Sequence, residues 1–216
     1  MKGTGLLKNT GNYDMNALVI IDVQNDFMPD GSLGVPEGDD IVRVINSIQD
    51  CFDLVIATQD WHPHDHVSFA SNHHGKAVFE KIDLDGVGQT LWPDHCVQGT
   101  KGAGFHPDLE THRFAAIFRK GMNPGVDSYS GFYDNNHQVS TGLAGYLREK
   151  GVTKAYFCGL ASDICVYYSI KDALAEGFPS VFIEDASKPL NKESFEDQKK
   201  ELAGLGVRII SSSDFF

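Results

Sequence analysis

The chain has 216 residues, of which 41% are hydrophobic and 11% aromatic, and this is enough for the core of a single domain. The 30 acidic residues outnumber the 18 basic ones and give a formal charge of −12, which disfavours nucleic acid and anionic membranes as partners. No segment has the length and apolarity of a signal peptide or a membrane span, so we expect a cytoplasmic protein. The cysteines are expected to be free thiols in a reducing compartment: Cys51, Cys96, Cys158 and Cys165.

Short apolar runs typical of buried parallel strands occur at 17–21, 54–57, 115–118, 155–158, 180–183 and 207–210. Apolar residues recur at helical spacing over 40–49, 139–149, 164–176 and 194–205, and Gly151 and Gly177 follow the second and third of these as expected helix ends. Residues 61–113 show little regular pattern, which predicts a long loop over the functional site. Strands that alternate with helices predict a doubly wound, three-layer α/β/α fold with a central six-stranded, mostly parallel sheet.

Ligands of such sheets bind beyond the carboxyl ends of the strands, so the residues that follow each strand are candidates for function. The first strand leads into Asp22. Partial burial would raise the pKa of this carboxyl and suit it to act as a base. Asp22, like Asp26 shortly after it, could instead cap the next turn.

The second strand leads into Asp60-Trp61-His62, where a carboxylate and an imidazole two residues apart point the same way on an extended chain. Further ligands could come from His66 or His95 in the same loop. A carboxylate with two or three imidazoles suits zinc, iron or manganese. The alternative is a loop that is merely rich in histidine, since most histidines of the chain lie there.

The third strand leads into Lys120, which could hold a carboxylate and stabilise a thiolate, although a solvated lysine at a strand end is common. After the fourth strand, a tight turn places Cys165 in the first turn of a helix. Unpaired N–H groups and the helix dipole favour a thiolate over a thiol there and can hold an oxyanion. A small buried residue at a strand–helix junction is the alternative interpretation.

The chain resembles the nicotinamidases, which are pyrazinamidase-type amidases of the isochorismatase-like cysteine hydrolase superfamily. The resemblance extends from Met15 to Ser211. Its motifs are DVQNDF at 22–27, QDWHP at 59–63, HVSF at 66–69, WPDHCV at 92–97, RKG at 119–121, YSGF at 129–132 and GLASDICV at 159–166. It implies the isochorismatase-like hydrolase fold for residues 15–216 as a single domain. Residues 1–14 form an amino-terminal extension outside the family pattern, for which disorder and an oligomer contact are both open.

The resemblance implies hydrolysis of nicotinamide to nicotinic acid and ammonia through a thioester, as a step of NAD salvage. In this comparison Cys165 is the nucleophile, Asp22 is the base and later the acid, and Lys120 supports both charges. The backbone N–H groups of Ala161 and Cys165 form the implied oxyanion hole, and the Leu160–Ala161 peptide is expected to be cis.

The resemblance also implies one divalent transition metal per chain, held by Asp60, His62 and His95 and bound to the pyridine nitrogen of the substrate. Zinc is expected ahead of iron or manganese. In some members a histidine at the position of His66 is a further ligand, and in others water takes its place. The implied walls around the ring are Phe27, Trp92 and Tyr129.

One departure from the family pattern is Ile164, which stands where several members carry His or Tyr and is expected to point away from the nucleophile. Two other activities occur in the superfamily. Amidohydrolases of carbamoyl or ureido groups share the Asp–Lys–Cys trio but lack the metal ligands, so Asp60, His62 and His95 argue against them. Isochorismatases that cleave a vinyl ether lack the cysteine, so Cys165 argues against them. A non-catalytic binding module on the same fold is the alternative from another class. The sequence does not rank nicotinamide against pyrazinamide, decide between a monomer and a homo-oligomer, or show whether the loop over the site moves.

Overall fold

The computed structural model describes residues 14–84 and 86–216, so the expected extension lies, apart from Asp14, outside the described residues. A six-stranded sheet has the order β5-β2-β1-β6-β7-β8, and every neighbouring pair in it is parallel. Its strands are β1 (Met15–Ile21), β2 (Leu54–Asp60), β5 (Phe114–Lys120), β6 (Val152–Leu160), β7 (Ser180–Lys188) and β8 (Arg208–Ile210). The six predicted strands are therefore confirmed.

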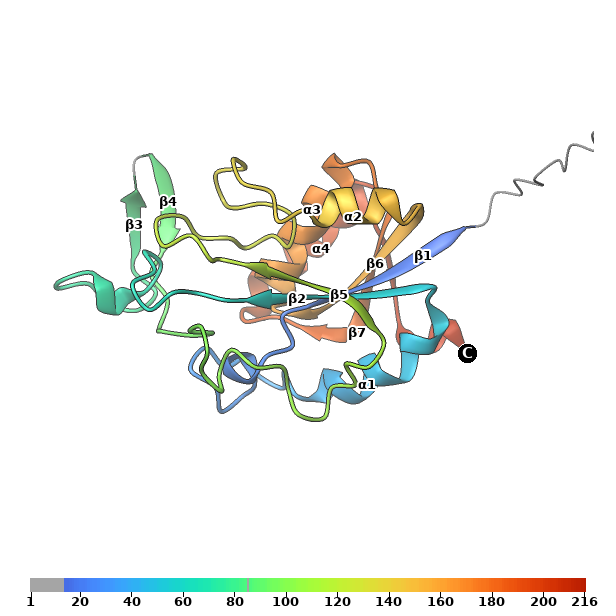
Figure 1. Cartoon of the computed structure of the whole chain (residues 1–216), viewed down its shortest axis with the longest axis horizontal. Helices are drawn as coiled ribbons and strands as arrows, with labels where there is room; N and C mark the ends of the chain where they lie inside the picture. The colour runs from blue at the N-terminus through green and yellow to red at the C-terminus, as the bar shows by residue number, and fades with distance from the viewer. Residues whose placement is uncertain (1–13, 85) are drawn as a thin grey trace, which may run out of the picture.

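Helices cover both faces of this sheet. Helix α1 (Asp40–Ile48) packs on one face, and α2 (Leu143–Glu149), α3 (Tyr167–Ala175) and α4 (Lys192–Gly204) pack on the other (Figure 1). Residues of β1 alternate between the two cores: Leu18 and Ile20 face α1, whereas Val19 and Ile21 face the opposite helices. Because both faces are covered at the centre of the sheet, β1 is buried and apolar from Ala17 to Ile21, whereas the edge strand β5 exposes alternate residues. The predicted three-layer α/β/α fold is confirmed.

The helix boundaries agree in part with those expected. Gly151 and Gly177 follow α2 and α3 with φ of 73° and 85°, the left-handed conformation that ends a helix. Helix α2 begins four residues later than predicted, directly after Gly142, whose φ is 91°. The segment predicted as one helix from 164 divides into a π-helical turn, Ser162–Val166, and α3.

The stretch from 61 to 113 is not irregular throughout. Strands β3 (Lys81–Leu84) and β4 (Val87–Thr90) form a two-stranded antiparallel sheet, which projects at the left of Figure 1. The expectation of a loop without regular structure was wrong here because each strand has only four residues, too few for a clear alternation. No helix in the described part of the chain is long and apolar enough to cross a membrane.

The strand order reverses between β1 and β6. From β1 the chain continues outward to β2 and β5, and from β6 it continues outward to β7 and β8 on the other side. Parallel sheets bind ligands at such a switch point. The four strands around this point end at or just before Lys120, Asp60, Asp22 and Cys165.

Candidate active site

Three buried side chains meet beyond the strand ends. The Nζ atom of Lys120 lies 2.9 Å from Oδ2 of Asp22 and 3.4 Å from Sγ of Cys165. The second oxygen of Asp22 accepts a hydrogen bond of 2.7 Å from the hydroxyl of Thr58. Asp22, Lys120 and Cys165 are 0%, 2% and 6% exposed, so water screens their charges little. The structure thus gathers the three predicted residues around one ammonium group.

Burial and mutual charge determine the protonation of this trio. Burial raises the pKa of Asp22, and the neighbouring Lys120 only partly opposes the shift. Burial acts to lower the pKa of Lys120, but the charges of Asp22 and Asp60 outweigh it and hold that pKa well above its usual value. The raised pKa expected for Asp22 is confirmed, and Lys120 is a cation at neutral pH.

The pKa of Cys165 contradicts the expectation of a resting thiolate. Burial raises the pKa of this thiol well above its usual value, and the carboxylates of Asp22 and Asp60 raise it further, whereas Lys120 lowers it. A helix dipole acts over the first turn only and does not offset two nearby carboxylates. Cys165 therefore rests as a thiol.

The turn that carries Cys165 differs from the predicted helix start. Cys165 lies in the π-helical turn between β6 and α3, and the Leu160–Ala161 peptide is cis, as the resemblance implied. Just before it, Gly159 has a φ of 115°, and a Cβ atom there would come within 2.0 Å of the carbonyl oxygen of Ile21. Glycine thus permits the close approach of β6 to β1 that brings Cys165 beside Asp22.

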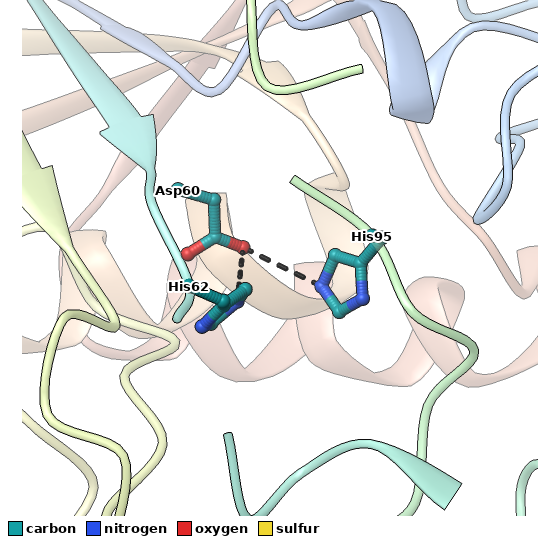
Figure 2. Close-up of side chains that lie close together, drawn as sticks. All are labelled: Asp60, His62 and His95. Atoms are coloured by element: carbon teal, nitrogen blue, oxygen red, sulfur yellow. Dashed lines mark ion pairs between the residues drawn. The ribbon is translucent and has the colours of Figure 1, made fainter. Parts of the chain in front are cut away.

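Asp60, His62 and His95 form a second group beside this trio (Figure 2). Oδ2 of Asp60 lies 3.2 Å from Nε2 of His62 and 3.7 Å from Nε2 of His95. Each ring donates its Nδ1 proton to a backbone carbonyl, His62 to Gly121 at 2.9 Å and His95 to Pro93 at 2.8 Å. Both Nε2 atoms therefore face the carboxylate. These donors, which lie within 4.8 Å of one another, fit a divalent transition metal.

Side-chain hydrogen bonds fix the backbone at Asp60 and at Cys96, beside the metal group. The buried side chain of Gln24 donates to the carbonyl of Asp60 and accepts from its N–H group, both at 2.8 Å. Oδ2 of Asp26 accepts a 2.7 Å hydrogen bond from the N–H of Cys96, next to His95, so this carboxylate fixes the ligand loop. The sequence had suggested for Asp26 only a cap on its own turn.

Gly121, whose carbonyl accepts the His62 proton, has no space for a side chain. Its φ is 66°, and a Cβ atom would lie 2.3 Å from Cε1 of the His62 ring. Glycine is therefore required at this position for the ring to lie where it does.

His66 borders the metal group on the side of His62, with the two ring centroids 4.2 Å apart. Its Nδ1 accepts a hydrogen bond of 3.3 Å from the N–H of Ser68 and lies 2.7 Å from the hydroxyl of that residue. Its Nε2 is buried and has no hydrogen-bond partner within the described part of the chain. Burial, together with the charge of His62, lowers the pKa of His66 to about 4, so the ring is neutral.

A pocket opens over Cys165. Its apolar lining consists of Phe27, Leu33, Val35, Trp92, Tyr129, Ala161, Ile164 and Leu190, and its polar lining consists of Asp60, His95, Asp127 and Cys165. The three aromatic residues predicted to surround the substrate ring, Phe27, Trp92 and Tyr129, thus line the same pocket as Cys165. Burial raises the pKa of Tyr129, so its hydroxyl stays protonated.

Ile164 also lines this pocket, in the same π-helical turn as Cys165. That its side chain points away from the nucleophile stays a prediction.

Comparison with known proteins gives a consistent result over almost the whole chain. The isochorismatase domain family matches residues 16–214. A nicotinamidase of Acinetobacter baylyi is 46% identical over 197 residues, which cover 91% of this chain and 92% of that protein. The structure of a nicotinamidase and pyrazinamidase of Acinetobacter baumannii has a TM-score of 0.91 at 45% identity, covering 95% of this chain and 100% of that one. A pyrazinamidase of Pyrococcus horikoshii, solved with zinc, has a TM-score of 0.75 at 36% identity, covering 91% and 98%.

Proposed function

The chain belongs to the isochorismatase family, and from that premise we propose that it is an amidohydrolase that converts nicotinamide to nicotinic acid and ammonia. One observation carries the proposal. The buried trio of Asp22, Lys120 and Cys165 adjoins a metal-ligand group at the end of a pocket with aromatic walls. The reaction returns nicotinamide to NAD salvage as nicotinic acid.

In the first half of the reaction, the sulfur of Cys165 attacks the carboxamide carbon while Asp22 takes the thiol proton. Because Cys165 rests as a thiol, proton transfer accompanies the attack. Lys120 stabilises both the carboxylate and the developing sulfur charge. Asp22 then returns the proton to the amide nitrogen, the carbon–nitrogen bond breaks, and ammonia leaves a thioester behind.

In the second half, a water molecule attacks the thioester and Asp22 accepts its proton. The carbon–sulfur bond breaks, Asp22 returns a proton to Cys165, and nicotinic acid is released. The N–H groups of Ala161 and Cys165 are the donors we assign to the oxyanion formed in each half.

The site takes one divalent metal ion, which Asp60, His62 and His95 would hold. We propose zinc, with iron and manganese as the alternatives, because a carboxylate with two imidazoles suits all three ions. When bound, the metal supplies a Lewis acid for the ring nitrogen of the substrate. The ring itself would pack against Phe27, Trp92 and Tyr129.

The test is ammonia release from nicotinamide by the purified protein as isolated, after chelation, and after separate addition of zinc, iron or manganese. We expect activity that chelation removes and at least one of these metals restores. Pyrazinamide and an N-carbamoyl amino acid serve as comparison substrates. Release from the carbamoyl compound alone would move the assignment to another amidohydrolase of the superfamily, and no release from any amide by folded, metal-loaded protein would favour a binding module.

Three further statements remain predictions: a single domain over residues 15–216, a cytoplasmic location, and the oligomeric state. The family match over residues 16–214 supports the first of them. Sedimentation of the purified protein would decide between a monomer and a homo-oligomer.

A further inference from the structure

A second carboxylate lines the pocket, in addition to that of Asp60. Asp127 lies in the loop after β5 and is 4% exposed, and it shares the pocket lining with Cys165. It belongs neither to the catalytic trio nor to the group of Asp60, His62 and His95. A buried carboxylate is costly unless other groups compensate its charge, so its presence in the pocket calls for a partner.

The protein supplies part of that compensation. Oδ2 of Asp127 accepts a hydrogen bond of 2.9 Å from the side-chain amide of Gln89, a buried residue of β4. Oδ1 accepts one of 2.8 Å from the N–H of Ser128. Within the part of the chain that the structure describes, these are the hydrogen bonds of the carboxylate, and both donors are neutral. Each oxygen retains the capacity to accept another hydrogen bond.

The position of Asp127 indicates where the missing donor would lie. Donor atoms of His62, His66 and Asp127 lie within 4.8 Å of one another, and His62 also belongs to the metal group. Asp127 and His66 therefore border the metal group on the same side. Nε2 of His66 is buried on this side and has no hydrogen-bond partner of good geometry among the described residues. A carboxylate with spare acceptor capacity and a buried ring nitrogen thus lie beside one metal ligand.

We propose that Asp127 is a positioning residue of the metal centre, whose carboxylate accepts a hydrogen bond from a water ligand of the ion. His66 lies on the same side, with its Nε2 atom buried there. Open positions on a metal held by three protein groups are commonly filled by water, and outer groups that orient the ligands contribute to metal affinity. The inference rests on the proposed metal centre but not on the identity of the amide substrate.

The test compares metal binding by the wild type, Asp127→Asn and Asp127→Leu. Asp134 provides the control, because it is a buried carboxylate of the same loop that accepts from the N–H groups of Gln138 and Val139 and lies outside the pocket over Cys165. Dissociation constants for Zn²⁺ and Mn²⁺ are measured by competition with a chromophoric chelator. We expect about 10- to 100-fold weaker binding for the Asp127 variants and a change within about twofold for Asp134→Asn.

A second readout separates the proposed role from a merely structural one. In Mn²⁺-loaded protein, the relaxation of bulk water protons reports water bound to the ion and its exchange. We expect a coordinated water in the wild type, faster exchange in Asp127→Asn, and wild-type behaviour in Asp134→Asn. The wild-type measurement holds even if an Asp127 variant fails to fold.

Four outcomes would overturn the inference. These are wild-type affinity in folded Asp127 variants, unchanged water exchange in Asp127→Asn, no coordinated water in the wild type, and a loss in Asp127→Asn beyond about 1,000-fold, which would make Asp127 a direct ligand. If the wild type binds none of the ions, the metal centre of the proposed function fails as well. If the wild type binds metal and the Asp127 variants match it, only the inference fails.

Discussion

Asp60 and Lys120 are cross-strand partners at the ends of β2 and β5, and Nζ of Lys120 donates to Oδ1 of Asp60 at 2.9 Å. The other oxygen of Asp60 faces His62 and His95. A single carboxylate thereby connects the catalytic trio to the metal group. A change at Asp60 or Lys120, which contact both groups, is therefore expected to affect both.

Replacing Cys165 by alanine should remove turnover and leave the metal group intact, because the metal-binding atoms of Asp60, His62 and His95 do not depend on the sulfur. Ammonia release should fall by about 1,000-fold or more. The measurements are turnover and metal content of the same preparation. Cys51→Ser is the matched control, because Cys51 is an exposed thiol and should be dispensable. Substantial turnover by Cys165→Ala would exclude the thioester route.

The acid side of the pH profile should reflect the raised pKa of Asp22. Burial raises this pKa above the usual aspartate value, with Asp60 adding to the shift. Only the ionised carboxyl can accept the thiol proton, so activity is present above this pKa and is lost as the pH falls through it. The loss of kcat/KM should therefore begin at a higher pH than for an exposed carboxyl, whose pKa is about 3.9. A profile of the wild type with an acid limb near that ordinary value would contradict the assignment.

Replacing Lys120 by methionine should destabilise the fold strongly. It would leave two buried carboxylates, Asp22 and Asp60, without their shared cation, and removing one partner of a buried ion pair costs about 3–5 kcal/mol. Urea unfolding of the chelated protein measures the change in the free energy of unfolding. Lys76→Met is the control, because the Lys76–Glu80 pair is exposed and should contribute little. Equal stabilities of the two variants would argue against the buried ion pairs.

Replacing Gly121 by alanine should displace the His62 ring, since the new Cβ atom would lie 2.3 Å from Cε1 and the backbone φ of 66° disfavours a side chain. We expect metal binding to weaken by about 10-fold or more, as the hydrogen bond that orients His62 is lost. Gly125→Ala in the same loop is the control, because the nearest atom to its Cβ would be at an ordinary 3.6 Å. Unchanged zinc affinity in Gly121→Ala would show that the ring is not held there.

The sequence predicted those features of the fold for which burial produces a recognisable run of apolar residues. Strands covered on both faces must be apolar throughout, so their positions could be predicted, and parallel strands of one sheet bring their carboxyl ends to one edge. The convergence of Asp22, Asp60, Lys120 and Cys165 could be anticipated from these two facts alone. The family resemblance was needed to choose His95 among many histidines of the same loop.

What the sequence did not reveal depends on contacts between distant segments. Gln24 and Asp127 are ordinary polar residues in the sequence, and their roles become visible only beside the backbone of Asp60 and the ring of His62. The resting state of Cys165 could not be inferred because it reflects a balance between burial, one cation and two carboxylates. The π-helical turn that contains Ile164 and Cys165 could not be predicted either, because a short sequence carries no clear signal for it.

In the sequence, the hairpin of β3 and β4 lies between two groups of site residues. Before it in the sequence lie Asp22, Asp60 and His62, and after it lie His95, Lys120 and Cys165. The first half thus holds two of the three metal-group residues and one of the catalytic trio, the second half holds the reverse, and Asp60 joins the two sets. A chain divided at the hairpin would yield two fragments, each without a complete site, and hydrolysis would then report that the fragments had reassembled.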